Sequence, residues 1–388
     1  MENTQIPEPN QIEKLRNGDA RKPYGWIILL VLVVLFMIFI GSRFIKGIGL
    51  NPQNFSSGNV PLNLLPMYGG EIKNETQLQA DKAFIETATK NMTGKEAAAG
   101  IVRGAWEFLN ARDYENAMRR LNQAWLLDPE NSDIYKGYLS IPYEKGQAEL
   151  LDYAIKVADQ NPGKATLRCF VGAIHNTIFT FSDPRDNKSL VQAESEFKAG
   201  LEIDPQNPFC NLNYAYTLSL GGQYDESWKL LTKNFSLENN RFDPDLVLHV
   251  YSKVEQIQSE DEYMMVGMAY GWLARHDESF DTFEKATEVH PNSALLQCNA
   301  GISAMNKWLA DKDNNLSYIA YSQNYFNKSI RMDPTSGMCH YNFAILLANQ
   351  AKYNEAWQEI KKARKLGWEN FNSEFLTGLE SVYPEPKN

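Results

Sequence analysis

The stretch Ala117-Met118-Arg119-Arg120-Leu121-Asn122-Gln123-Ala124-Trp125-Leu126-Leu127-Asp128-Pro129 decides the fold. The small residues Ala117 and Ala124 stand two helical turns apart on one face, with Leu121 between them, so a second helix can lie close against this one. Residues 101–108 supply that partner helix, and residues 113–114 supply the connecting turn. The stretch therefore predicts a helical hairpin that ends at a proline-bearing turn.

The same hairpin recurs along the chain. Its clearest copy has Gly267 in the first helix and Phe283 in the second. Units of 33 or 34 residues fit at 98–131, 131–163, 208–241, 260–293 and 337–370, and the same unit with an insertion of about nine residues fits at 164–207 and 294–336. We therefore expect an all-α solenoid of about seven helical hairpins.

The repeats resemble the tetratricopeptide repeat, with Ala, a bulky apolar residue, Ala and Pro in the second helix. Residues 67–128 also resemble a widespread set of bacterial tetratricopeptide proteins. The shared elements are Met67-Tyr68-Gly69-Gly70, Asp81-Lys82-Ala83-Phe84-Ile85 and residues 117–128, with Leu121 in place of a Phe. This resemblance implies the fold and says little about function, because such arrays serve as adaptors, chaperones and assembly factors.

A second regularity has an offset of 129 residues. Between 149–228 and 278–357, eighteen of eighty positions are identical, including the pairs Cys169/Cys298, Cys210/Cys339, Asn213/Asn342 and Trp228/Trp357. The simplest interpretation is a duplicated block of three repeats, with residues 242–259 as a helix that joins the two copies.

An apolar segment near the N-terminus predicts a membrane anchor. Residues 23–42 carry no charge, and as a helix they span about 30 Å, the thickness of the hydrocarbon core of a bilayer. The alternative is a cleaved signal peptide, but no Ala-x-Ala-like site follows. Four cations precede the segment and two follow it (Lys14, Arg16, Arg21 and Lys22, then Arg43 and Lys46), which predicts a cytoplasmic N-terminus.

These features divide the chain into successive parts. We expect a cytoplasmic tail (1–22), a transmembrane anchor (23–42), a linker (43–75), a capping helix (76–97), repeats one to four (98–241), the joining helix (242–259), repeats five to seven (260–370) and a C-terminal cap and tail (371–388). This layout is similar to that of inner-membrane proteins that assist the secretion channel or cytochrome maturation.

Arrays of this family bind ligands in the concave groove lined by the first helix of each repeat. Aromatic and Met side chains at the groove positions suit an apolar or extended peptide. The alternative is that many of these side chains pack between neighbouring helices. The predicted protein-binding residues are Trp106, Tyr135, Tyr143, Phe209, Tyr216, Met264, Met268, Trp272, Met338 and Tyr341.

The four cysteines allow two interpretations. They fall in first helices of adjacent repeats, so disulfides Cys169–Cys210 and Cys298–Cys339 can form in an oxidising compartment. Alternatively, all four are small buried hydrophobic residues. Their spacing excludes a zinc ribbon and a redox Cys-x-x-Cys motif.

Nothing in the sequence indicates catalysis. The five histidines fit no metal or catalytic spacing, and the motifs of serine hydrolases, phosphate-binding loops and zinc proteases are missing. We expect no enzyme activity, no metal and no cofactor. The net charge of -10, without a basic stripe, argues against nucleic-acid binding.

We therefore expect a non-enzymatic scaffold, anchored in the bacterial inner membrane with its repeats in the periplasm. It would dock protein partners of the cell envelope through the concave groove and contact the lipid bilayer through one helix. Three alternatives stay open: a periplasmic holdase-type chaperone for exported chains, a structural or accessory subunit of a membrane-bound enzyme or secretion complex, and a eukaryotic organelle receptor with cytosolic repeats.

Overall fold

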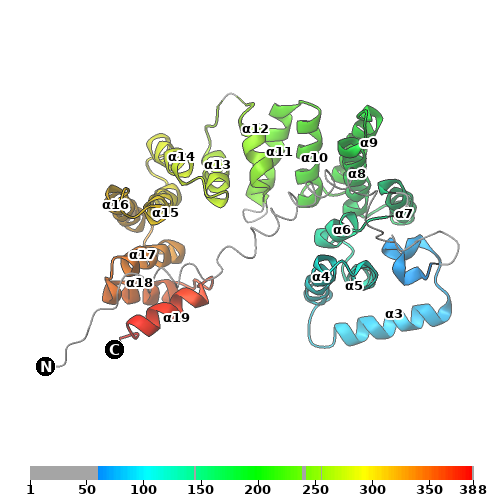
Figure 1. Cartoon of the computed structure of the whole chain (residues 1–388), viewed down its shortest axis with the longest axis horizontal. Coiled ribbons are helices and arrows are strands. Elements are labelled where there is room, and N and C mark those ends of the chain that lie inside the picture. The colour runs from blue at the N-terminus through cyan, green and yellow to red at the C-terminus, as the bar shows by residue number, and fades with distance from the viewer. Residues whose placement is uncertain (1–59, 144–145, 238–241, 255, 387–388) are drawn as a thin grey trace, which may run out of the picture. The chain divides into compact units, whose positions relative to one another are not determined.

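The computed structural model describes residues 60–143, 146–237, 242–254 and 256–386, and these residues form helices and turns without a strand. They fall into two compact units, which meet in the sequence between Gln256 and Ile257. Within each unit, consecutive helices pair as hairpins (Figure 1). The prediction of an all-α solenoid is therefore confirmed for this part of the chain.

The N-terminal unit begins with two short 3-10 turns and continues through ten α-helices. They are η1 (Leu62–Leu64), η2 (Pro66–Gly70), α3 (Glu75–Ala88), α4 (Gly94–Asn110), α5 (Tyr114–Leu127), α6 (Ser132–Leu139), α7 (Gln147–Gln160), α8 (Ala165–Phe181), α9 (Asn187–Ile203), α10 (Pro208–Leu220), α11 (Tyr224–Leu237) and α12 (Pro244–Tyr251).

The C-terminal unit consists of seven α-helices. They are α13 (Glu260–Trp272), α14 (His276–Val289), α15 (Ala294–Ala310), α16 (Ser317–Met332), α17 (Gly337–Asn349), α18 (Tyr353–Lys365) and α19 (Ser373–Val382).

No helix in the described ranges is long and apolar enough to cross a membrane. The predicted tail (1–22), the predicted anchor (23–42) and the linker as far as residue 59 lie outside the described residues.

Glycines in first helices let the paired helices approach closely. A Cβ built on Gly267 would lie 2.5 Å from the ring of Phe283, and one built on Gly301 would lie 2.9 Å from the ring of Phe326. The Gly–Phe pairs seen in the repeat pattern are therefore contacts across the hairpin. Among the described residues, six pairs of consecutive helices form such hairpins: α4/α5, α8/α9, α10/α11, α13/α14, α15/α16 and α17/α18.

Substitution of Gly267 tests this packing. Gly267→Ala is expected to destabilise the chain by about 1–3 kcal/mol, because the methyl group overlaps the Phe283 ring. The control Gly271→Ala lies on the same helix and meets only Ser279 Oγ at 3.4 Å, so the better helix propensity of Ala should leave stability unchanged or slightly higher. Urea unfolding of both variants checks the prediction, which is wrong if their midpoints agree.

The predicted second repeat (131–163) does not form a closed hairpin. Helix α6 ends at Leu139 because Ile141 precedes Pro142, and a proline cannot continue the hydrogen-bond ladder. Helix α7 packs against α8 and against the η2 turn instead of lying along α6. Of the seven expected hairpins, the second one is therefore open. A segment from before the repeats packs on its second helix, α7.

That segment has a left-handed backbone. Met67, Tyr68, Gly69 and Gly70 have φ values of 53°, 56°, 65° and 61°. Each non-glycine residue in this conformation costs about 1–2 kcal/mol, so the surroundings must hold it. Met67 is buried in the core, and Lys73 Nζ lies 3.2 Å from the centroid of the Tyr68 ring. We call residues 61–73 the plug.

Helix α12, predicted as a joining helix, is a cap on the N-terminal unit. It packs on α11, with the rings of Trp228 and Tyr251 6.1 Å apart. Its N-cap Asp243 and the α19 N-cap Asn372 stand at the offset of 129, and each side chain accepts a hydrogen bond from the amide three residues on. Each duplicated block therefore ends in its own capping helix, and the two units divide directly after the first cap.

The predicted N-terminal capping helix (76–97) is shorter than expected. Helix α3 ends at Ala88 and buries none of its residues, and α4 begins at Gly94. Thr93 and Glu96 form a capping box, which starts a new helix at this point. Residues 94–97 therefore belong to the first repeat.

Candidate protein-binding groove

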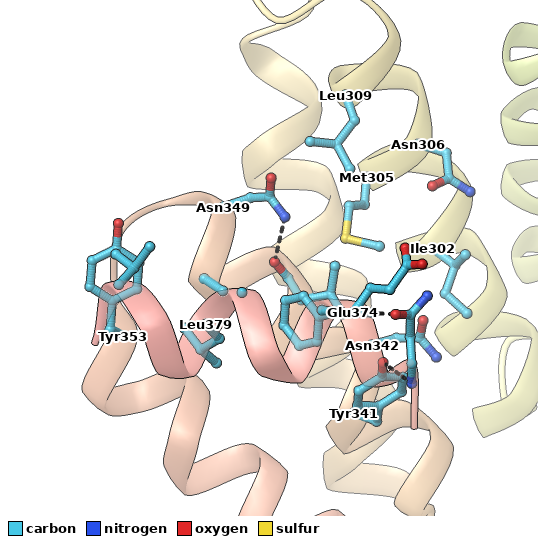
Figure 2. A pocket seen from close by; sticks show the side chains of 16 residues that line it. Ile302, Met305, Asn306, Leu309, Tyr341, Asn342, Asn349, Tyr353, Glu374 and Leu379 are labelled. Carbon is cyan, nitrogen blue, oxygen red and sulfur yellow. Dashed lines mark hydrogen bonds between the residues drawn. The ribbon is translucent and has the colours of Figure 1, made fainter. Parts of the chain in front are cut away.

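A cavity of about 330 Å³ lies in the C-terminal unit between the first helices α15 and α17 and the terminal helix α19. Figure 2 shows the side chains that line it, with Met305 and Leu309 on α15, Asn342 and Asn349 on α17, and Leu379 on α19. We call this cavity and its walls on α15 and α17 the groove. It is built from the helices that the repeat pattern assigns to the concave face.

Helical periodicity gives the groove its apolar walls. Ile302, Met305 and Leu309 are spaced three and four residues apart, so they share one face of α15. Ile345 and Ala348 form the matching face of α17. On the opposite side, α19 contributes Phe375, Leu379 and Val382 with the same periodicity. The cavity therefore suits an apolar ligand.

Tyr341 connects the groove to the cap. Its hydroxyl accepts a hydrogen bond of 2.9 Å from the backbone N–H of Asn372, and its ring lies 5.0 Å from that of Phe371 and 6.0 Å from that of Phe375. Burial raises the pKa of Tyr341, and the hydrogen bond from Asn372 opposes this rise in part. The phenol therefore stays neutral and acts as a fixed acceptor for the N-terminus of α19.

Amide side chains add a polar element to the apolar wall. Asn342 and Asn349 each donate one N–H to the carbonyl four residues earlier, Met338 O and Ile345 O, at 2.9 Å. Each amide keeps a carbonyl oxygen and a second N–H, and both residues line the cavity. The groove can therefore bury apolar side chains and also hydrogen-bond polar groups of a peptide.

Residues 325–358, which run from the end of α16 into α18, match a family model described as "Tetratricopeptide repeat". The match covers the second half of α16, all of α17 and the first part of α18. These residues therefore form a tetratricopeptide repeat. No curated protein matches the sequence of the chain.

Several solved tetratricopeptide structures are similar to this repeat protein. "YrrB: a TPR protein with an unusual peptide-binding site" is 14% identical over 59% of this chain and 96% of its own, with a TM-score of 0.27. TTC0263, a thermophilic TPR protein in Thermus thermophilus, is 15% identical over 53% of this chain and 98% of its own, with a TM-score of 0.30. A tetratricopeptide repeat protein from Parabacteroides merdae is 12% identical over 74% of this chain and 98% of its own, with a TM-score of 0.31.

Four of the residues predicted to line the binding groove are buried in the repeat protein. Tyr135, Phe209, Met264 and Tyr341 are each at most 6% exposed. The rings of Tyr135 and Phe209 are 6.2 Å apart, and Phe170 lies 4.8 Å from Tyr135, so these aromatics fill the space between successive helices. Tyr135, Phe209 and Met264 therefore follow the alternative interpretation, packing between helices, whereas Tyr341 lines the groove beneath α19.

The other predicted groove residues keep some accessible surface. Trp272 is 52% exposed at the end of α13. The half-buried residues are Trp106, Tyr143, Tyr216, Met268 and Met338. None of these six side chains lines the cavity between α15, α17 and α19. The sequence prediction missed Ile302, Met305 and Ile345, although their three- and four-residue spacing was visible.

The two cysteine pairs differ. Cys169 and Cys210 form a disulfide with their Cα atoms 5.3 Å apart, whereas Cys298 and Cys339 are free and buried. The disulfide interpretation therefore holds for the first pair, and the interpretation as small buried hydrophobic residues holds for the second. The two pairs also differ at an equivalent neighbouring position, which is Gly200 in the first block and Ser329 in the second.

Gly200 leaves room for the two sulfurs, whereas Ser329 places a hydroxyl beside them. A Cβ on Gly200 would lie 2.3 Å from Cys169 Sγ. In the second block, the Ser329 hydroxyl donates to Ala294 O at 2.7 Å and contacts Cys339 Sγ at 3.2 Å. The second block therefore has a hydroxyl against the thiol where the first block has only a glycine.

Within the described residues, no group of three or more His, Cys, Asp or Glu side chains is placed to hold a metal ion.

Proposed function

We propose that this tetratricopeptide repeat protein is a non-enzymatic scaffold that docks other proteins through the groove of its C-terminal unit. The observation that supports the proposal most directly is the apolar cavity between α15, α17 and α19. A cavity with apolar walls and a few amides suits the side chains of a peptide or helix better than a polar substrate.

We further propose that residues 23–42 anchor the scaffold in a bacterial inner membrane and that the repeats work in the periplasm. The charge-free segment and the cations before it support this orientation. The disulfide Cys169–Cys210 also favours an oxidising compartment, because cytosolic thiols are kept reduced. In this position the scaffold would organise a complex of the cell envelope.

Acidic substitutions in the groove test the docking function. The double variant Ile302→Glu/Ile345→Glu places two charges on half-buried positions of the apolar wall. Purification of the tagged full chain from mild detergent should recover at least tenfold less of any stoichiometric partner than the wild type does, because desolvating a carboxylate in an apolar site is unfavourable.

Val289→Glu is the matched control, since Val289 is 48% exposed on α14 and does not line the groove. It should recover the partner at the wild-type level. Circular dichroism should show the same helicity for all three chains. Equal recovery by the groove variant and the control would show that the partner binds elsewhere.

A further inference from the structure

The terminal helix α19 lies shallowly on the groove. Of its ten residues only Gly378 and Leu379 are buried, and the cavity of about 330 Å³ remains beneath it. The equivalent helix α12 buries Leu246, Val247 and Val250 and packs closely along α11. Helix α19 approaches none of the other described helices as closely. The second cap therefore fills its site less completely than the first.

The segment after α19 is held by one face of α18. The Trp357 indole N–H donates to Tyr383 O at 2.8 Å, and Lys361 Nζ donates to Pro386 O at 2.9 Å. Arg364 donates to both carboxylate oxygens of Glu385, at 2.9 and 3.1 Å. The Tyr383 hydroxyl donates to Asn354 Oδ1 at 2.9 Å. The four α18 residues stand three or four apart, so they form one stripe.

These contacts are the kind that bind a separate peptide. Two of them capture main-chain carbonyls, and a third pairs a guanidinium with a carboxylate. Pro384 and Pro386 have no N–H, so the tail cannot continue the helix. The ion pair is partly exposed, with side-chain exposures of 41% for Arg364 and 30% for Glu385. Such pairs contribute little stability, so this ion pair adds little to the attachment of the tail.

We propose that α19 and the tail Tyr383–Pro386 are a self-ligand that a partner displaces from the groove. The partner segment carries the same chemistry: an amphipathic helix with large apolar residues at positions 1, 5 and 8, followed by an extended, proline-containing stretch with an acidic residue. In α19 those helix positions are Phe375, Leu379 and Val382. This inference rests on the proposed docking function and names the partner's chemistry and the regulation of the same groove.

A peptide added in trans tests the proposal. A fluorescein-labelled peptide of residues 371–386 is titrated with full-length wild type and with the full-length variant Tyr383→Ala/Glu385→Arg, whose own tail loses its contacts with Asn354 and Arg364. In the wild type, the tethered segment competes at an effective concentration of about 1 mM. Fluorescence anisotropy should therefore show at least tenfold tighter binding to the variant.

Two controls define specificity. Glu369→Arg makes the same charge change at an exposed residue outside the tail, and it should bind the peptide as weakly as the wild type does. A peptide with Phe375→Asp and Leu379→Asp should bind none of the chains. Equal affinity of the tail variant and the wild type, or equal binding of the two peptides, would overturn the proposal.

Hydrogen exchange of the wild-type chain gives a second measurement. Amides of α19 should exchange at least tenfold faster than those of α17, and exchange as slow as in α17 would overturn the proposal. The groove variant Ile302→Glu/Ile345→Glu separates the two hypotheses. If it loses the peptide but keeps its protein partner, the tail binds the groove, but the docking function and the displacement by that partner fail. If it loses the partner but keeps the peptide, the self-ligand fails.

Discussion

Asn122→Ala is expected to destabilise the N-terminal unit by about 3–5 kcal/mol and to release the plug. Asn122 is fully buried, and its Oδ1 accepts from Met67 N at 2.8 Å and from the Tyr138 hydroxyl at 2.7 Å. Its amide donates to Asn63 O and Leu65 O, at 3.0 and 2.8 Å. Alanine removes all four bonds, at a cost of about 1–3 kcal/mol for each buried group left unpaired. Met67 N keeps a bond of 3.3 Å to the Tyr138 hydroxyl, and Leu65 O keeps one of 3.0 Å from Tyr68 N.

Hydrogen exchange and limited proteolysis of the full chain measure this effect. The amides of residues 62–70 should lose protection, and a protease should cut within residues 60–74. Gln123→Ala is the control, because Gln123 is the next residue on α5, is half-buried and bonds only Arg120 among the described side chains. The hypothesis is wrong if the Asn122 variant and the control keep equal protection at the plug.

The disulfide Cys169–Cys210 is the second feature with a large expected effect. It closes a loop with a sequence separation of 41 residues, so reduction should lower the stability of the N-terminal unit by about 3–4 kcal/mol. Gly200→Ser should prevent the bond from forming, because the new Cβ would overlap Cys169 Sγ. Ser329→Gly makes the opposite change in the other block and should allow Cys298 and Cys339 to pair.

Alkylation followed by mass spectrometry counts the thiols in unfolded, unreduced protein. Of the four cysteines, two should react in the wild type, all four in Gly200→Ser, and none in Ser329→Gly. Four reactive thiols in the wild type would show that the first pair is not bonded. Two in Gly200→Ser would show that the glycine is not needed.

Local sequence patterns predicted much of the fold. Ala117, Leu121 and Ala124 are all buried without exposed surface, as their spacing on one face of α5 predicted. The pairing of Gly267 with Phe283 depends on the same principle, because a small residue opposite a large one allows two helices to touch. Such signals lie within one repeat of about 34 residues, where sequence distance and spatial distance agree.

Contacts between segments that are far apart in the sequence could not be predicted from such patterns. Asn122 stands on the recognised stretch, yet its partners Asn63 and Leu65 lie more than fifty residues earlier. The left-handed turn includes Met67 and Tyr68, which sequence rules do not associate with positive φ. The groove could not be predicted from the sequence either, because α19 forms its third wall and the sequence does not show where that helix packs.

The sequence by itself determined the repeating helical hairpin, the duplicated block and the charge-free segment at 23–42, because each is a pattern of neighbouring residues with a fixed physical meaning. Only the tertiary structure decided which aromatics are buried, which cysteine pair is bonded and what covers the groove. Those outcomes depend on a few ångströms between helices, where one residue such as Ser329 or Pro142 changes the packing.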